Sequence, residues 1–313
     1  MTNRRLSYTR SAFARRVMMS GDRLFAIVEG IDLDSPFYDR VCSSSEKIRD
    51  AGYQIWLAQQ IKEDTESQGA SGKTAVLAHF DYFKKKKQLT FKSTDGAVRS
   101  IAFMIDRDNE DITGGSRRSQ HVIYTDMFDV ESEIFFHGKD AKALSTALSL
   151  DMKSADHLVA HLGDWVNDLS VIWRDWIEWC CIAKSTGARC EVGFSKESII
   201  NVPKYGPVDP AARAKETAIV TRRAKCGPSE FARKKAIISQ RMATRHAKGD
   251  GAKTVRGKWL PFYLMYLVDQ YFGSNPYVYK GFTGIAARIY LDSCDFNEDW
   301  VSSYHSRLEK IIF

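Results

Sequence analysis

The stretch Ile101–Asp111, IAFMIDRDNED, decides our expectation for the fold. Its five apolar residues, Ile101–Ile105, predict a buried strand that ends abruptly in Asp106, Arg107 and Asp108. Carboxylates two residues apart, just past a strand end, can lie together at the carboxyl edge of a sheet, where open α/β folds place their sites. Such a pair suits Mg²⁺, which commonly takes one or two protein carboxylates with waters and substrate phosphates. A DxD pattern alone is a weak motif, so a solvated acidic turn is the alternative interpretation.

A second apolar run, Leu24–Val28, predicts another strand, which leads directly into Glu29-Gly30. The segments around it predict a helix over Ser35–Ala51, a strand over Tyr53–Leu57, a helix over Thr74–Lys87 and a short strand over His121–Tyr124. Strands that alternate with helices favour a parallel sheet flanked by helices. We therefore expect an α/β fold in which Glu29 and Asp106 meet at one edge of the sheet.

The chain of 313 residues is 44% apolar, which is enough for a sizeable core. We expect two parts, an α/β core over residues 1–137 and a mainly helical region over residues 138–313. Residues 139–185 are apolar at helical spacing, and the tryptophans Trp165, Trp173 and Trp176 follow that spacing. Such a stripe is typical of a helix–helix core, so we interpret it as structural.

The net charge of +7 is concentrated in one segment. Residues 204–258 hold 15 Lys and Arg against 4 Asp and Glu, a local charge of +11, whereas the rest of the chain holds 31 basic and 35 acidic residues. Within the segment, Ser229–Lys248 predicts one basic helix. A basic surface beside an acidic body suits a polyanion ligand, and a solvated loop is the alternative.

Several classes of protein are excluded by the sequence. The six cysteines form no CxxC motif, so we expect reduced thiols in a cytoplasmic protein. The basic N-terminus lacks the apolar region of a signal peptide, and no window approaches the roughly 20 apolar residues of a membrane helix. His157 and His161 lie four residues apart without a third ligand nearby, which favours a structural role over a metal site.

A near match to a phosphate-binding loop lies at Ser67–Thr74, SQGASGKT. Ser67 occupies the place of the first glycine of the GxxxxGK[ST] pattern, and no apolar strand leads into it. We therefore expect Gly72-Lys73 to open a helix, and not to bind a nucleotide.

Three motifs in order carry a resemblance. Val28-Glu29-Gly30 is followed by Asp32, Asp34 and Phe37-Tyr38, then by Ile105-Asp106-Arg107-Asp108, and then by Thr125-Asp126…Asp129-Val130-Glu131. This order resembles the Toprim fold of metal-dependent nucleases. More narrowly, it is similar to the OLD-like nuclease family of bacterial anti-phage effectors, which includes the AriB-like effectors of the PARIS defence system. The resemblance covers about Phe25–Phe136, with a weaker echo at Gly257-Lys258.

The resemblance implies roles for particular residues. Glu29 would be the Toprim glutamate, Asp106 and Asp108 the DxD metal ligands, and Glu131 a candidate further ligand of Mg²⁺ or Mn²⁺. Lys258 would stabilise charge on the phosphate during cleavage, as a lysine does in OLD nucleases. The spacing after Glu29 is one residue longer than in the family pattern, which leaves open whether Asp32 or Asp34 fills the next acidic position.

The resemblance also implies a biological setting. AriB-like effectors are partnered with an ABC-type ATPase that holds them inactive until a phage protein is sensed, after which they are released as homodimers. Their substrate class is RNA, notably tRNA, whereas OLD enzymes cut DNA. The basic residues that would contact the nucleic acid are Arg222, Arg223, Arg233, Lys234, Lys235, Arg241, Arg245 and Arg256. The alternative is a non-catalytic, Toprim-shaped module that docks on the ATPase. The sequence leaves open the cleavage site, the number of metals and the trigger.

Overall fold

The computed structural model describes residues 7–63, 72–92, 96–273 and 281–313. The chain divides into two compact units. Unit 1 comprises Met1–Asp106, Arg117–Thr125 and Asp295–Phe313, and unit 2 comprises Arg107–Ser116 and Asp126–Cys294. The division thus falls between Asp106 and Arg107, inside the DxD motif, and the last residues of the chain return to unit 1. The domain boundary expected at residue 137 does not coincide with this division and stays a prediction.

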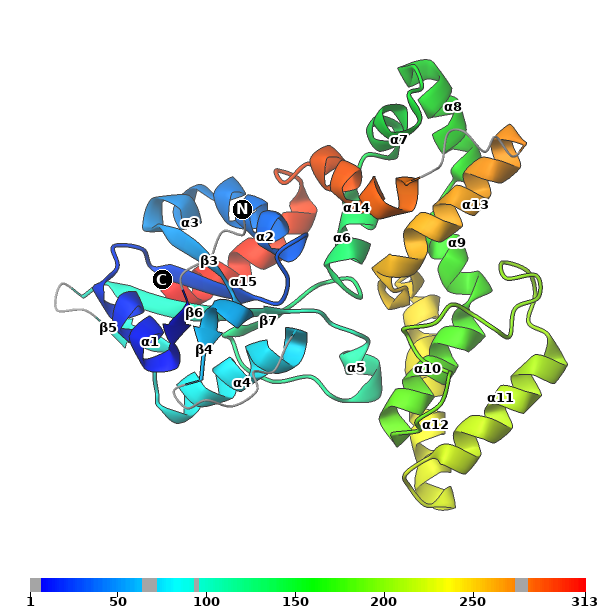
Figure 1. The fold of residues 1–313 in the computed structure, drawn as a ribbon, viewed down its shortest axis with the longest axis horizontal. Coiled ribbons are helices and arrows are strands. Elements are labelled where there is room, and N and C mark those ends of the chain that lie inside the picture. The colour runs from blue at the N-terminus through cyan, green and yellow to red at the C-terminus, as the bar shows by residue number, and fades with distance from the viewer. Residues whose placement is uncertain (1–6, 64–71, 93–95, 274–280) are drawn as a thin grey trace. The chain divides into compact units, whose positions relative to one another are not determined.

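Unit 1 is an α/β unit in which helices flank a sheet (Figure 1). Its elements are β1 (Tyr8–Thr9), α1 (Arg10–Met19), β2 (Leu24–Val28), α2 (Asp34–Ser44), α3 (Glu46–Ala51), β3 (Tyr53–Leu57), η1 (Ala58–Gln60), β4 (Ile61–Lys62), α4 (Gly72–Lys85), β5 (Thr90–Lys92), β6 (Val98–Ile105), β7 (Val122–Tyr124), η4 (Asp299–Val301) and α15 (Ser302–Ile312). The expected α/β fold is therefore present. Of the near match at Ser67–Thr74, residues 67–71 lie outside the described residues, and Gly72-Lys73 opens α4, as expected.

The main sheet has β6 at its centre. β2 pairs in parallel with both β3 and β6, and β7 pairs in parallel with the last residues of β6. β5 pairs with the first residues of β6 in the antiparallel direction. The expectation of a parallel sheet is confirmed for these four strands, but β5 makes the sheet mixed. The short β1 and β4 form a separate parallel pair.

The apolar run of β6 is continuous because helices cover both faces of the sheet. Ile101, Phe103 and Ile105 pack into one core cluster with residues of α1 and α4, such as Phe13 and Phe80. On the opposite face α15 lies against the strand, where Ser100 Oγ donates to the Ile311 carbonyl. The side chains of successive strand residues alternate between these faces, so every residue from Ser100 to Ile105 is buried.

The helix expected over Ser35–Ala51 is wrong as a single element, because the chain breaks at Ser45. The Ser45 backbone is extended, with φ −88° and ψ 118°, and its hydroxyl accepts a hydrogen bond from the Ile48 amide (3.3 Å). Serine is a favoured N-cap for this reason, so α2 ends and α3 begins at the same residue. Gly52 then ends α3 with a positive φ of 75°, a conformation that glycine adopts without a steric cost.

Unit 2 is helical in the part of the chain that the structure describes. Its elements are α5 (Glu110–Thr113), α6 (Val130–His137), α7 (Asp140–Leu148), α8 (Met152–Leu162), α9 (Trp165–Ile172), α10 (Arg174–Thr186), α11 (Pro210–Arg223), α12 (Pro228–Ala247), η2 (Gly251–Thr254), η3 (Gly257–Trp259), α13 (Leu260–Phe272) and α14 (Phe282–Ser293). The expected helical region over residues 139–185 is four helices, and the basic helix expected over Ser229–Lys248 is α12. Trp165, Trp173 and Trp176 are buried, which confirms that the stripe is core.

None of the helices within the described ranges is long and apolar enough to cross a membrane. The six cysteines are free thiols.

Candidate functional site

Glu29 and Asp106 come together in unit 1. Each follows the last residue of its strand, Glu29 after β2 and Asp106 after β6, and these strands are parallel neighbours with Ile27 opposite Phe103. The Glu29 Oε1 atom lies 3.5 Å from the Asp106 amide nitrogen, so the side chain of one strand end reaches the backbone of the other. Both residues are half-buried. The two acid-bearing strand ends therefore meet at the carboxyl edge of the sheet.

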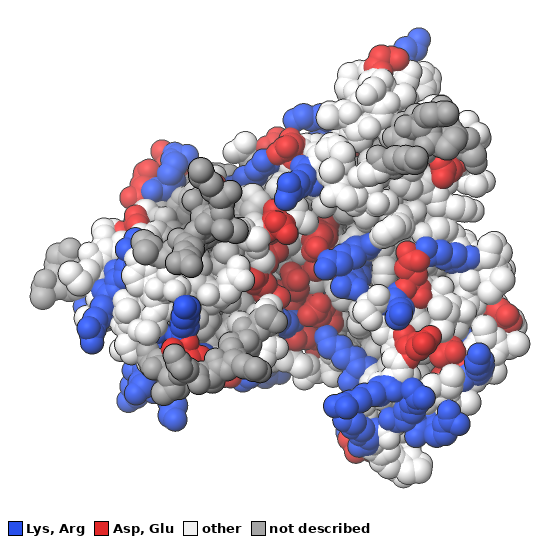
Figure 2. All heavy atoms as spheres, in the orientation of Figure 1, with Lys and Arg blue, Asp and Glu red and all other residues white. Residues whose placement is uncertain are grey.

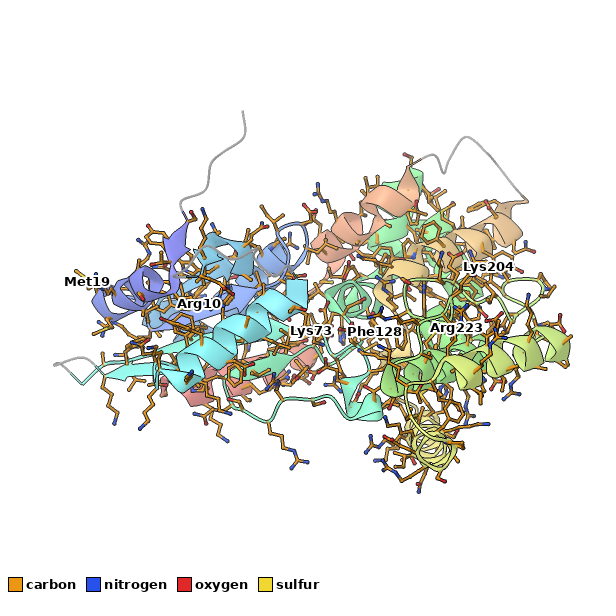
Figure 3. All side chains as sticks on the ribbon, turned by 60° about the horizontal axis from the view of Figure 1, so that its bottom comes forward. Arg10, Met19, Lys73, Phe128, Lys204 and Arg223 are labelled. Atoms are coloured by element: carbon orange, nitrogen blue, oxygen red, sulfur yellow. The ribbon has the colours of Figure 1, made fainter. Side chains whose placement is uncertain are left out.

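A lysine that our sequence analysis left out of the site lies at the same edge. Lys73, labelled in Figure 3, is in the first turn of α4, and its Nζ donates to the Asp106 carbonyl oxygen (2.5 Å). Nζ also lies 5.7 Å from the centre of the Tyr124 ring. The signal that could have revealed Lys73 was the Gly-Lys-Thr end of the near match to a phosphate-binding loop.

The structure gives Asp34 a local role. Its Oδ2 accepts a hydrogen bond from the Gly30 amide (2.7 Å), which fixes the turn between β2 and α2 just after Glu29. Asp32 is exposed on the same turn. The choice between Asp32 and Asp34 as a further acidic ligand stays open.

Asp108 belongs to unit 2, where it lies in a tightly held turn. Asp108 and Asn109 both have positive φ, 49° and 56°, which is uncommon for residues other than glycine and costs free energy. The Asp108 amide donates to the Phe128 carbonyl (2.9 Å), and Lys184 Nζ donates to the Asp108 carbonyl (3.0 Å). Buried Asn109 donates to the Thr254 carbonyl (3.1 Å). Several helices of unit 2 thus hold this turn in its unusual conformation.

Asp129, at the start of α6, is buried and fully engaged. Its carboxylate accepts hydrogen bonds from the Ser132 amide (2.8 Å), the Ser132 hydroxyl (2.6 Å) and the Gly257 amide (3.0 Å). Burial raises the pKa of the Asp129 carboxyl, and the neighbouring charge of Glu131 raises it further. Asp129 is therefore the N-cap of α6 and a clamp on the segment that carries Lys258.

Glu131 and Gly257, the residue before Lys258, are brought close by this bond to Asp129. Gly257 lies so near the first turn of α6 that a Cβ atom on it would be 2.3 Å from the Glu131 Cβ. Glycine is required there by the close approach. Glu131 is half-buried and Lys258, the next residue along from Gly257, is exposed. The Gly257-Lys258 motif therefore lies next to the third acidic motif, Asp129-Val130-Glu131, within unit 2.

Glu133 is an acidic residue of this region that our sequence analysis missed. It is completely buried, and its Oε1 accepts from the amides of Asp126 (2.5 Å) and Met127 (2.8 Å). It therefore fixes the turn that leads into α6. A second glutamate directly before the apolar residues Ile134–Phe136 of α6 was the signal that could have pointed to it.

The basic residues of unit 2 fall into two sets. Figure 2 shows Lys and Arg side chains gathered where α11 and α12 lie. Arg222, Arg223, Arg233 and Lys235 are exposed on these helices, although Arg223 also donates to the Arg189 carbonyl (3.0 Å). The other predicted nucleic-acid contacts are bonded within the unit, as follows: Lys234 to Glu230 and the Ser185 carbonyl, Arg241 to the Asp111 and Ile112 carbonyls, Arg245 to the Asp111 carboxylate, and Arg256 to the Phe194 carbonyl.

A hard divalent cation prefers oxygen ligands such as carboxylates. Across the described ranges, no three His, Cys, Asp or Glu side chains form a group that could hold a metal ion. Glu29 and Asp106 follow the last residues of neighbouring parallel strands, so two acidic residues belong to this sheet edge, which is within the one or two carboxylates that Mg²⁺ takes when waters and substrate phosphates complete its shell. The donor set of unit 1 therefore fits Mg²⁺ or Mn²⁺ bound together with a phosphate.

The predicted site residues thus form two groups. Glu29 and Asp106 belong to unit 1, whereas Asp108, Glu131 and Lys258 belong to unit 2. No protein-family model matches the chain, and no curated protein matches it significantly. The resemblance to Toprim nucleases therefore rests on the three motifs.

Proposed function

We propose that this protein is a metal-dependent nuclease with a Toprim-like core, which cleaves phosphodiester bonds in nucleic acid. tRNA is the favoured substrate and DNA the alternative. In this proposal the protein is the toxic effector of an anti-phage defence system in the bacterial cytoplasm, held inactive by an ABC-type ATPase and active as a homodimer.

One observation carries the proposal. The Glu29 side chain reaches the end of β6 at Asp106, with Oε1 3.5 Å from the Asp106 amide nitrogen. Parallel strands place their carboxyl ends at one edge of the sheet, where α/β proteins bind ligands. Glu29 and Asp106 would hold Mg²⁺ or Mn²⁺ there, and such an ion, when bound, lowers the pKa of water and stabilises charge on a phosphoryl group.

The basic surface supports a polyanionic substrate. The exposed cations of α11 and α12 would contact phosphates, which position a nucleic acid without reading its sequence. Such contacts suit tRNA and DNA equally, so the choice between them has to come from the products.

A second candidate, a Toprim-shaped binding module without catalysis, is favoured by the third acidic motif. Asp129 caps α6 and binds the Gly257 amide, so it serves structure within unit 2. A module of this kind would still dock on the ATPase.

The test is expression of the protein in bacteria, with and without the ABC-type ATPase, during phage challenge. Wild type is compared with Glu29→Gln and with Asp50→Asn, a matched change at an exposed carboxylate of α3. We expect cleaved tRNA with wild type and Asp50→Asn, and intact tRNA with Glu29→Gln. Broken DNA with intact tRNA would move the proposal to the DNA-cutting alternative. Protection by Glu29→Gln at the wild-type level would favour the binding module.

A further inference from the structure

Lys73 lies at the strand edge of unit 1 that carries Glu29 and Asp106. Its Nζ donates to the carbonyl oxygen of Asp106, the residue at which β6 ends (2.5 Å). The same peptide segment offers its amide to Glu29, from the neighbouring strand (3.5 Å). The ammonium group and the Glu29 carboxylate therefore approach the same residue from two different elements of unit 1.

The first turn of α4 also passes close to Glu29. A Cβ atom placed on Gly72 would lie 3.7 Å from the Glu29 Oε2 atom. Because Gly72 has a positive φ of 58°, the chain turns into the helix directly beside the carboxylate. Backbone amides at the start of a helix carry partial positive charge, so the turn that presents Lys73 adds to the positive potential at this strand edge.

We infer that Lys73 is a catalytic residue of the proposed nuclease, and that it donates a hydrogen bond to a non-bridging oxygen of the scissile phosphate. The inference rests on the proposed function. In the reaction, water adds to phosphorus, one ester P–O bond breaks, and a proton passes to the leaving oxygen. Lys73 transfers no proton. It offsets the negative charge that builds on the phosphoryl oxygens in the transition state.

The chemistry of the side chain fits this role. An ammonium group carries three N–H donors and no acceptor, so it suits the oxygen atoms of a phosphate. Lysine is a compact point charge that commonly binds phosphates, as in phosphate-binding loops. Lys73 is half-buried, whereas Lys84 and Lys85 in the last turn of the same helix are exposed.

Lys73 and Lys258, the lysine that the resemblance suggests, belong to different units. Lys258 belongs to unit 2, beside the first turn of α6, whereas Lys73 shares unit 1 with Glu29 and Asp106. The two lysines therefore make competing predictions about which side chain supports cleavage.

Two variants separate the charge of Lys73 from its structural bond. Lys73→Met removes both the charge and the donor to the Asp106 carbonyl. Lys73→Gln removes the charge but keeps an N–H donor for the Asp106 carbonyl. If that hydrogen bond is all that Lys73 contributes, Lys73→Gln should keep the wild-type structure at the end of β6 and the wild-type activity. Lys84→Met is the matched control, because Lys84 is an exposed lysine of the same helix.

The experiment measures tRNA and DNA cleavage by the full-length protein with Mg²⁺ and, where it is needed for activity, the ATPase and trigger. We expect kcat to fall by about a hundredfold in both Lys73 variants, the typical effect of removing one charge-stabilising donor, and KM to change little. Lys73→Arg should recover part of kcat, since it restores the charge. Lys84→Met should match wild type. Binding of Mn²⁺, followed by electron paramagnetic resonance, should be retained in Lys73→Gln.

Three outcomes decide the inference. Wild-type kcat in Lys73→Gln, with loss of activity in Lys258→Met, would overturn it and assign the charge to Lys258. A lower kcat in Lys73→Met that Lys73→Gln fully restores would also overturn it, because the bond to Asp106 would then be the whole function. If wild type, Glu29→Gln and Lys73→Gln all leave every substrate intact under triggering conditions, the proposed function itself fails, which is a different result from either.

Discussion

Glu29 in unit 1 and Asp129 in unit 2 are acidic residues of the same sequence pattern, yet the structure treats them differently. Glu29 is half-buried at the end of β2, and its Oε1 lies 3.5 Å from the Asp106 amide nitrogen. Asp129 is buried and accepts three hydrogen bonds of 2.6 to 3.0 Å from Ser132 and Gly257. A carboxylate saturated by protein donors has few lone pairs left for a ligand. Under the proposed function, acidic residues of one motif order therefore serve chemistry in unit 1 and folding in unit 2.

The largest effect on stability is expected from Asp129→Ala. It removes the N-cap of α6 and leaves the buried Gly257 amide without its acceptor, which together should lower the free energy of unfolding by about 3 kcal/mol. Urea unfolding followed by circular dichroism measures this. Asp156→Ala, at an exposed aspartate of α8, is the control and should change the free energy by less than about 0.5 kcal/mol.

Asp129→Asn sharpens the same comparison. Asparagine keeps a side-chain oxygen that can accept from the Ser132 amide, so we expect it to recover most of the lost stability. If Asp129→Ala unfolds at the same urea concentration as wild type, Asp129 is not a structural clamp, and its contrast with Glu29 disappears.

A somewhat smaller effect is expected from Gly257→Ala. The added Cβ would lie 2.3 Å from the Glu131 Cβ and 2.5 Å from the Ser132 amide, so the segment must move away from α6. Overpacking of this kind costs about 2 kcal/mol. The matched control is Gly193→Ala, where a Cβ would meet nothing within 4 Å and φ is not positive. Equal melting temperatures for the two variants would mean that Gly257 and α6 are not in close contact.

The sequence predicted unit 1 better than the site. A continuous apolar run that ends in acidic residues is a local signal. β2 coincides with its predicted run, Leu24–Val28, and β6 ends where predicted, at Ile105, although it begins earlier, at Val98. By contrast, the break at Ser45 depends on a hydroxyl that accepts from one backbone amide, and hydrophobic periodicity carries no information about it. Lys73 was missed for a related reason. The Gly-Lys-Thr pattern around it is a signal for phosphate binding, but only the tertiary structure shows that Lys73 lies at Asp106.

The division of the chain inside the DxD motif was also beyond the sequence. Asp106 and Asp108 are two residues apart, but they belong to different compact units because Asp108 is held by the Phe128 carbonyl and by Lys184. Spacing in the chain predicts that two carboxylates can meet. That spacing does not predict which distant residues will form hydrogen bonds with the backbone between the two carboxylates.

Within unit 2, the two sets of basic residues give a third prediction. Arg233→Ala with Lys235→Ala should weaken nucleic-acid binding and reduce its salt dependence, because exposed cations contact phosphates, and should leave stability nearly unchanged. Arg245→Ala should instead lower stability by about 1 kcal/mol, since it breaks the ion pair with Asp111 on α5.

Fluorescence anisotropy with labelled tRNA across a salt titration, together with urea unfolding, separates the two sets. If Arg245→Ala weakens binding as much as the double variant does and leaves stability unchanged, its bond to Asp111 is not its main role. If nucleic-acid binding by the wild-type protein does not depend on salt concentration, the basic surface does not contact the phosphates.

The smallest expected effect concerns pH and tests unit 1. His79 is buried, accepts from Arg10 Nε at Nδ1 (3.0 Å), and lies with Nε2 3.0 Å from the Ala58 carbonyl oxygen, so the neutral ring fits this environment. Burial lowers the pKa of His79, and the charge of Arg10 lowers it further, against opposing contributions from the Ala58 carbonyl and Glu63. A histidine whose pKa is lower in the folded chain contributes stability above its unfolded pKa of about 6.5, and this stability is lost as the pH falls through the folded value.

We therefore expect the free energy of unfolding to fall between pH 7 and pH 5, and to fall less steeply in His79→Gln. Urea unfolding at half-unit pH intervals measures both slopes. His121 and His246 also have lowered pKa values because of burial, so part of the slope should remain in the variant. Identical slopes would mean that His79 protonates as readily in the folded chain as in the unfolded one. The bonds to Arg10 and Ala58 would then not hold the ring in its neutral form.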